Sequence, residues 1–168
     1  GRTFITNGPL LEFHVASKTP GDTIRLVPPL GLTGEAIARS RVDFGRLELV
    51  QNGRVRETAQ AQFREGHYEA KLVVAIAVAE PCWLAARVSS TAKNEFGHPL
   101  FAHTSPVYVT VGGRTVQQED DIRFLLGELE SARGTIGEKA RFDTDEQRSG
   151  ILDLYDRATA ELQKRLRK

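Results

Sequence analysis

The chain has 168 residues, enough for one domain or for one domain with an appendage. Its 23 basic and 22 acidic side chains give a formal charge of +1, so no large net field favours nucleic acid or a membrane surface. No apolar run reaches the roughly 18 to 20 residues that a membrane-spanning helix needs. We therefore expect a globular protein that binds neither nucleic acid nor membrane. The compartment, cytoplasmic or exported, stays open.

The chain contains one cysteine, Cys82, which cannot form a disulfide within it. Exported bacterial proteins do not always carry disulfides, so this single residue does not indicate the compartment. Cys82 lies beside Trp83 in an apolar stretch, which predicts a small buried side chain rather than a catalytic thiol. Trp83 stands where β-sandwiches bury a tryptophan, so we expect it in the core.

From about residue 9 to residue 111, apolar and polar residues alternate, and turn residues separate the alternating stretches. The clearest hairpin has Asn52-Gly53 at its turn, because this pair suits the positive φ angles of a type I′ turn. The expected strands are 11–15, 24–28, 36–41, 47–51, 55–63, 68–77, 82–89 and 106–111, preceded by a strand-like piece at 3–6. About seven short strands of this kind favour an antiparallel immunoglobulin-like β-sandwich. A seven- or eight-stranded barrel is the alternative.

At Gly112-Gly113 the periodicity changes from strand-like to helical. The first predicted helix opens with acidic residues at 119–121 and carries the apolar stripe Ile122, Leu125, Leu126, Leu129, Ala132 and Ile136. The second follows a capping box of Thr144 and Gln147 and carries the stripe Ile151, Leu154, Tyr155, Ala158, Leu162 and Leu166. We expect a junction at 1–8, a sandwich at 9–113 and a C-terminal helical hairpin at 114–168.

No motif of catalytic or metal chemistry occurs in the chain. The four histidines, His14, His67, His98 and His103, do not have the spacing of a metal site. There is no phosphate loop, dinucleotide fingerprint or Gly-x-Ser-x-Gly elbow. We therefore expect that this chain by itself is not an enzyme and holds no cofactor.

Five segments, in order, resemble metallohydrolases of the CehA/McbA (carbaryl-hydrolase) type, which belong to the PHP superfamily. Residues 1–9, GRTFITNGP, resemble the segment that follows the catalytic domain in that family. The other four are Pro20-Gly21-Asp22, residues 47–55, residues 83–87 and residues 102–109. The helical tail also resembles the C-terminal end of these proteins.

The resemblance implies a role without chemistry of its own. Family members hold a divalent metal in an N-terminal PHP domain, and its ligand motifs do not occur here. The chain is then expected to be a C-terminal accessory domain whose partner is its own N-terminal catalytic domain. A start without methionine fits excision from a longer chain, although a cleaved leader would leave the same mark. A second copy of the chain stays open as a partner, and the substrate of the parent protein is not indicated.

Six residues are candidates for the interface with that domain. Arg2, Thr6 and Asn7 lie at the junction, and the others are Arg87, His103 and Thr104, the last two in an expected loop with Ser105. The alternative is structural: residues 7–9 and 104–106 are turns with side-chain to backbone hydrogen bonds, and Arg87 pairs with a surface carboxylate.

Two other functions stay open. The first is a free-standing immunoglobulin-like binding or adhesion module, which aromatic residues on loops or a calcium-type carboxylate cluster would favour. Neither feature is evident in the sequence. The second, ranked last, is a small hydrolase in which His98 or His103 meets a carboxylate and a nucleophile across strands.

Overall fold

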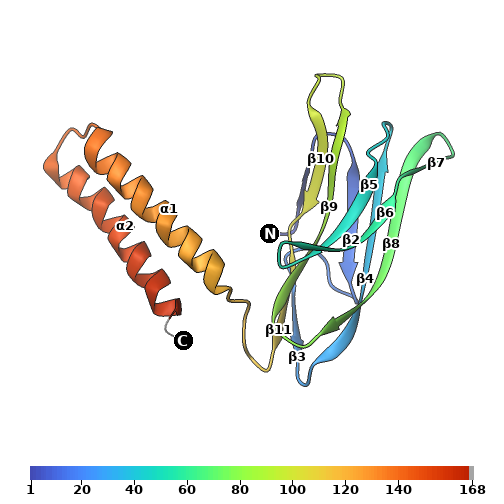
Figure 1. Ribbon diagram of the computed structural model, residues 1–168, viewed down its shortest axis with the longest axis horizontal. Helices are drawn as coiled ribbons and strands as arrows, with labels where there is room; N and C mark the ends of the chain where they lie inside the picture. Colours follow the sequence, from blue (N-terminus) through green and yellow to red (C-terminus); the bar gives the residue numbers. More distant parts are fainter. Residues whose placement is uncertain (167–168) are drawn as a thin grey trace. The chain divides into compact units, whose positions relative to one another are not determined.

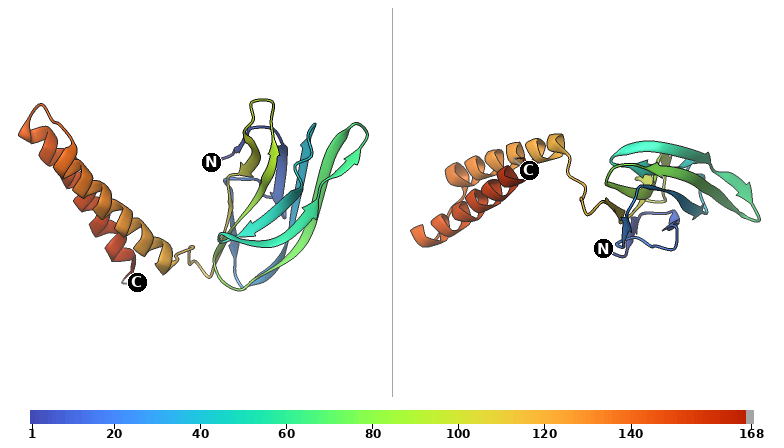
Figure 2. Two further views of the ribbon diagram at one scale, coloured as in Figure 1. Left: turned by 45° about the horizontal axis from the view of Figure 1, so that its top comes forward. Right: turned by 90° about the horizontal axis from the view of Figure 1, so that it is seen from below.

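The computed structural model describes residues 1–166. The chain forms two compact units, and the division lies between Val116 and Gln117. The first unit holds eleven strands in two sheets, and the second holds two helices. Figures 1 and 2 show the two layers of strands and the helical pair.

The smaller sheet has four antiparallel strands in the order β2-β4-β8-β7. Its central pair is long, because every residue of β4 (Leu30–Ser40) has a partner on β8 (His67–Val78). β2 (Leu10–Val15) pairs with the other edge of β4, and the short β7 (Gln62–Arg64) pairs with β8. Alternating burial along β2 shows that one face of this sheet lies on the core and the other faces solvent.

The larger sheet has seven strands and is built around β9 (Cys82–Lys93). On one side of β9, β5 (Arg46–Gln51) pairs with it and with β6 (Arg54–Gln60). On the other side, β11 (Val107–Val111) pairs with the first half of β9 and β10 (Pro99–Thr104) with the second half. The outer edge is divided between β3 (Thr23–Leu26) and β1 (Phe4–Thr6). The β3–β11 pair is parallel, an exception to the antiparallel sheet that we expected.

Apolar side chains from both sheets form one core. The largest fully buried ones include Phe44, Leu47, Leu49, Leu84 and Leu100. Burying a leucine or phenylalanine contributes about 1.5–3 kcal/mol. The strands form two separate sheets around this shared core, so the alternative of a closed barrel is wrong and the predicted two-sheet arrangement is confirmed.

The strand pattern differs from the expectation at three places. β10 falls on residues expected to be a loop, and β4 begins at Leu30, six residues before the predicted start. The strand expected at 55–63 is two strands, β6 and β7, which belong to different sheets and meet at Ala61. The chain also changes sheets between β1 and β2.

The two residues at 82–83 have different environments. Cys82 is buried as predicted, and burial raises the pKa of its thiol. Trp83 is only half-buried, so its expected place in the core is wrong. Cys82 and Leu84 point inward on β9, and Trp83 therefore points to the outer face.

The second unit is a hairpin of two packed helices, as predicted. α1 (Glu119–Lys139) and α2 (Asp145–Leu166) are joined through an N-terminal cap in which Thr144 Oγ1 accepts a hydrogen bond from the Gln147 N–H. Gln147 Oε1 accepts from the Asp143 N–H, which completes a variant of the predicted capping box.

The apolar stripes of this hairpin are narrower than predicted. Ile151, Leu154 and Leu125 are exposed, and Leu152 packs near Gly137 between the helices instead. A 3.6-residue period places neighbouring positions within one broad face, so the sequence pattern did not separate them. Neither helix, over its described residues, is apolar enough for its length to cross a membrane.

Candidate interaction surface

Four of the strands of the larger sheet place chemically distinct side chains in one row across its outer face. Ile5 on β1 lies opposite His103 on β10, His103 opposite Arg87 on β9, and Arg87 opposite Glu48 on β5. The neighbouring positions Leu47, Val88 and Ala102 point into the core, so the row points away from it. The junction strand and the region of His103 therefore share one surface.

Glu48 is the most unusual member of this row. Its side chain is 1% exposed although it occupies an outward position. Its Oε1 accepts a hydrogen bond from Arg46 Nε at 2.7 Å, and its Oε2 accepts one from Arg87 Nε at 2.6 Å. Burial acts to raise the pKa of Glu48, but the hydrogen bonds from Arg87 and Arg46 outweigh burial and hold the pKa below its usual value. Glu48 is thus an ionised carboxylate enclosed by two cations.

The junction residues make contacts that belong to the fold. The Asn7 side chain makes the hydrogen bonds to β10 that the backbone of a neighbouring strand would otherwise make. Its Nδ2 donates to the Pro99 carbonyl and its Oδ1 accepts from the Phe101 N–H, each at 2.7 Å. Thr6 Oγ1 donates to the Pro9 carbonyl and accepts from the Gly8 N–H. The Asn7 contacts fit the structural alternative, which predicted side-chain to backbone bonds at residues 7–9, and Thr6 makes bonds of the same kind.

Arg2 is exposed and lies in the junction segment. It pairs with Asp22 at 2.8 Å while its own side chain is 76% exposed. Asp22 also accepts a hydrogen bond from the Thr19 backbone N–H, and this bond is the main cause of a lowered pKa at Asp22. The pair connects the junction to the turn before β3, so the segment at residues 20–22 lies beside residue 2.

His103 and Thr104 lie in β10, and the expected loop is wrong. His103 is exposed on the outer face, whereas Thr104 points inward and is buried. The hydroxyl of Thr104 accepts a hydrogen bond from the Ala86 N–H at 3.1 Å. Thr104 is therefore held against β9 by the fold, and it also lines the groove that includes Arg2. Arg87 does pair with a carboxylate, but with the buried Glu48 rather than a surface one.

Three grooves mark the surface of the first unit. One of about 270 Å³ runs between β1, β2 and the turn before β3, and it includes Arg2, Glu12 and His14. A second, of about 590 Å³, is lined by Asn7, Arg41, Asn94 and Glu95 among others. The third, of about 600 Å³, lies beside Tyr108, Arg25 and Val116. None of these three includes the Arg46, Glu48 and Arg87 side chains.

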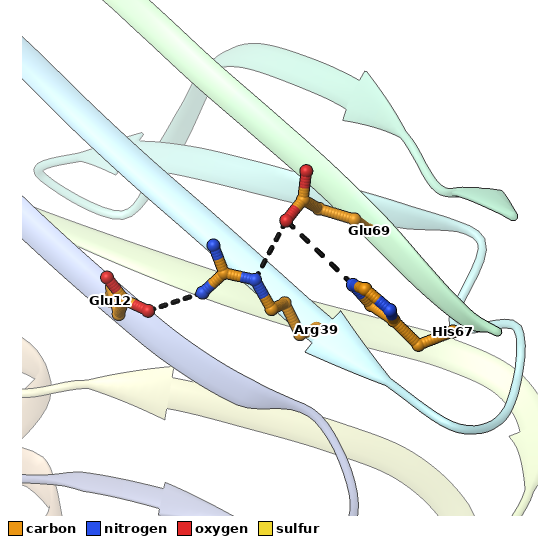
Figure 3. A network of polar contacts seen from close by, with 4 residues as sticks. All are labelled: Glu12, Arg39, His67 and Glu69. Atoms are coloured by element: carbon orange, nitrogen blue, oxygen red, sulfur yellow. Dashed lines mark hydrogen bonds and ion pairs between the residues drawn. The ribbon is translucent and has the colours of Figure 1, made fainter. Parts of the chain in front are cut away.

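The outer face of the smaller sheet carries a different network. Figure 3 shows Arg39 between Glu12 and Glu69, with His67 beyond Glu69. His67 Nε2 lies 4.0 Å from Glu69 Oε2 and has no hydrogen-bond partner within residues 1–166. The described part of the chain contains no group of three or more His, Cys, Asp or Glu side chains that could hold a metal ion.

Three notable residues were not singled out from the sequence. Glu48 and Arg46 carry no motif, since their importance comes from cross-strand neighbours. Phe96 lies in the turn between β9 and β10 and is 77% exposed. Asn94 Oδ1 fixes that turn by accepting hydrogen bonds from the N–H groups of Phe96 and His98. Phe96 is an aromatic residue on a loop, a feature that would favour a binding module.

Comparison with protein-family models and with curated proteins finds no match to this chain.

Proposed function

We propose that this chain is a non-catalytic accessory domain of a larger metal-dependent hydrolase of the PHP superfamily. Its catalytic domain would be joined N-terminal to the junction segment and would carry the divalent metal. The chain's own part is structural: it would present the outer face of the seven-stranded sheet to that domain. Of the six interface candidates, the proposal keeps Arg2, Arg87 and His103 as contacts, and it gives Thr6, Asn7 and Thr104 a supporting role within the fold.

One observation carries this proposal. The five segments that resemble the family are scattered through the sequence, yet they gather on or against the larger sheet. Residues 1–9 include β1, residues 47–55 form the β5–β6 hairpin, residues 83–87 lie in β9, and residues 102–109 span β10 and β11. The turn at 20–22 joins them, because Gly21 N–H donates to the Pro106 carbonyl. The smaller sheet contains none of the five, which supports a role located on one face.

The immunoglobulin-like arrangement is part of the same proposal. The order β2-β4-β8-β7 corresponds to strands A, B, E and D of such domains, and β5, β9 and β10–β11 correspond to C, F and G. The pairings of β9 with β5, β10 and β11 support this assignment.

The test is to find the open reading frame that surrounds residue 1 and to express the longer protein beside this chain. Both proteins are assayed for bound metal by elemental analysis and for hydrolysis of generic phosphoesters, amides and carbamates. We expect metal and turnover in the longer protein alone. Metal or turnover in the 168-residue chain would overturn the proposal.

A second candidate function is a free-standing binding module, and the exposed Phe96 favours it. An open reading frame with an export leader directly before residue 1 would support this candidate over the first. In that case Phe96→Ala should reduce ligand binding without changing the unfolding midpoint, because most of this side chain is exposed to solvent. An upstream domain in the reading frame would count against it.

A further inference from the structure

Glu48 holds two arginine side chains in a fixed arrangement on the outer face of the larger sheet. Each carboxylate oxygen accepts one Nε–H, from Arg46 and from Arg87. The enclosed carboxylate cannot turn toward solvent without losing both bonds, because its side chain is 1% exposed. It therefore anchors two guanidinium groups that would otherwise sample many rotamers.

Both arginines keep most of their donors available. Within residues 1–166, the terminal Nη atoms of Arg46 and Arg87 have no hydrogen-bond partner, and the side chains are 55% and 44% exposed. A guanidinium is a planar fork of donors that fits the two oxygens of a carboxylate. Glu48 already fixes the orientation of both guanidinium groups. Binding of a partner would therefore cost these two side chains little conformational entropy.

The surrounding face has the charge that an acidic partner needs. On β3, β5 and β9 its outward positions carry four cations against one carboxylate, the buried Glu48; the cations are Arg25, Arg46, Arg87 and Lys93. His103 lies beside Arg87, and the exposed apolar side chains Ile5 and Phe101 flank it.

The outer face of the smaller sheet serves as an internal comparison. Its charged side chains are balanced: Glu12, Glu35 and Glu69 stand against Arg39, Arg64 and Lys71. Arg39 there is bonded to two carboxylates of its own sheet, as Figure 3 shows. The arginines of the larger sheet instead share a single carboxylate. Cations that outnumber the carboxylates are thus found on the outer face of the larger sheet and not on that of the smaller sheet.

We propose that Arg46 and Arg87, oriented by Glu48, bind the carboxylates of an acidic protein surface. The inference deepens the proposed function and rests on it for the partner's identity: the acidic surface belongs to the catalytic domain. A protein is favoured over a small anion because the three grooves described above do not include these side chains, which leaves an open face with an apolar rim. It is favoured over nucleic acid because two guanidinium groups held by one carboxylate fit two neighbouring carboxylates, whereas a nucleic acid presents a long row of phosphates.

The first test uses a capped oligoglutamate peptide as the probe and the full chain labelled with ¹⁵N. We expect saturable binding, with amide shifts centred on Arg46, Arg87 and His103. An oligoglutamine peptide of the same length should produce none. Arg87→Gln should weaken binding about tenfold, the value of one charge-assisted contact. Arg39→Gln is the matched control, since it removes the same charge from the opposite face and should leave binding unchanged.

A second variant separates orientation from simple charge. Glu48→Gln makes the face more positive, so a merely electrostatic surface would bind the peptide more tightly. The proposed receptor loses its anchor and should bind several-fold more weakly. Arg87→Lys keeps both the charge and a pairing with Glu48 but removes the fork. It should also weaken binding, and it keeps the test decisive if Glu48→Gln does not fold.

Three results would overturn the inference. These are tighter binding by Glu48→Gln, full binding by Arg87→Lys, or equal affinity for a single-stranded oligonucleotide, which would indicate a general polyanion surface. None of these depends on an upstream domain. If the reading frame lacks a hydrolase and the peptide still binds in this manner, the proposed function fails and the carboxylate site stands. If the reading frame contains a hydrolase domain but the peptide does not bind in this manner, the proposed function stands and the carboxylate site fails.

Discussion

Ile5 and His103 lie directly opposite each other in the antiparallel pair of β1 and β10. They are far apart in the sequence, and only the return of the chain to this sheet brings them together. The contact places the junction segment on the same outer face as Arg87 and Glu48. A domain attached through residues 1–3 would leave the chain at the edge of this face.

The anchor residue Glu48 should make stability depend on pH. The pKa of Glu48 is lowered in the folded protein, so its contribution is complete above the unfolded value, about 4.3, and is lost as pH falls through the lower folded value. At neutral pH we expect Glu48→Gln to lower the free energy of unfolding by about 1–3 kcal/mol. Urea unfolding followed by Trp83 fluorescence should show this difference shrinking as the pH falls below about 4.

The control for this measurement is Glu35→Gln, at an exposed outward position on β4. It should change the free energy of unfolding little at any pH. If the prediction holds, the difference in the free energy of unfolding between wild type and Glu48→Gln does not stay constant from neutral to acid pH. A constant difference would show that the two arginines do not stabilise the ionised form of Glu48.

Asn7 should stabilise the end of β10 through its two backbone contacts. Asn7→Ala removes both and should cost about 0.5–1.5 kcal/mol. Asn7→Asp keeps the acceptor for the Phe101 N–H but loses the donor to Pro99. Hydrogen exchange at the Phe101 amide should therefore accelerate strongly in Asn7→Ala and less in Asn7→Asp. Unchanged protection in the alanine variant would show that β10 does not need this side chain.

The cap at Thr144 should stabilise the start of α2. Thr144→Ala removes the acceptor for the Gln147 N–H and should cost about 0.5–2 kcal/mol. Exchange of the amides of residues 147–148 measures the effect locally. Thr135→Ala, at an exposed position inside α1, is the control and should be neutral or slightly stabilising, because alanine favours helix. Equal behaviour of the two variants would contradict the cap.

Cys82 should not react in the folded protein. It is 1% exposed, and burial raises the pKa of its thiol, so little thiolate reaches solvent. A thiol reagent should label it only as the first unit unfolds in urea. Ser17→Cys, in the exposed turn after β2, supplies a second thiol that should react at once. Rapid native labelling of Cys82 itself would contradict the buried assignment.

Strands with regular alternation could be predicted from the sequence, and those with exceptional residues could not. β10 was missed because its inward positions are Leu100, Ala102 and Thr104, of which only the first is a large apolar residue. Thr104 can point inward because the Ala86 N–H bonds its hydroxyl. The early start of β4 was missed because Gly31 and Gly34 resemble turn residues. A Cβ at Gly34 would lie within 3.0 Å of side-chain carbons of Ile76 and Leu49, so packing explains this glycine.

The candidate surface was predicted only in part. The resemblance indicated Arg87 and His103, and register brings them side by side. The sequence gives no sign of Glu48, because an acidic residue between Leu47 and Leu49 predicts an exposed position. Its burial depends on two arginines, one of which lies on another strand. The contact with Arg87 follows from the register of β5 on β9, and the local pattern of either strand does not show which strand lies beside it or in which register.

The parallel pairing of β3 with β11 has a mechanical consequence. Tension applied between residue 1 and Val116 would load β11 from its last residue, and it would load β3 from its first residue once β1 and β2 have been drawn away. Strands that run parallel are then sheared along their length, and all their hydrogen bonds resist at once. The antiparallel β1–β10 pair is pulled at one shared end, between Phe4 and Thr104, and opens one bond at a time. β1 would therefore detach under low force, whereas the parallel β3–β11 pair would resist a higher force once the load reaches it.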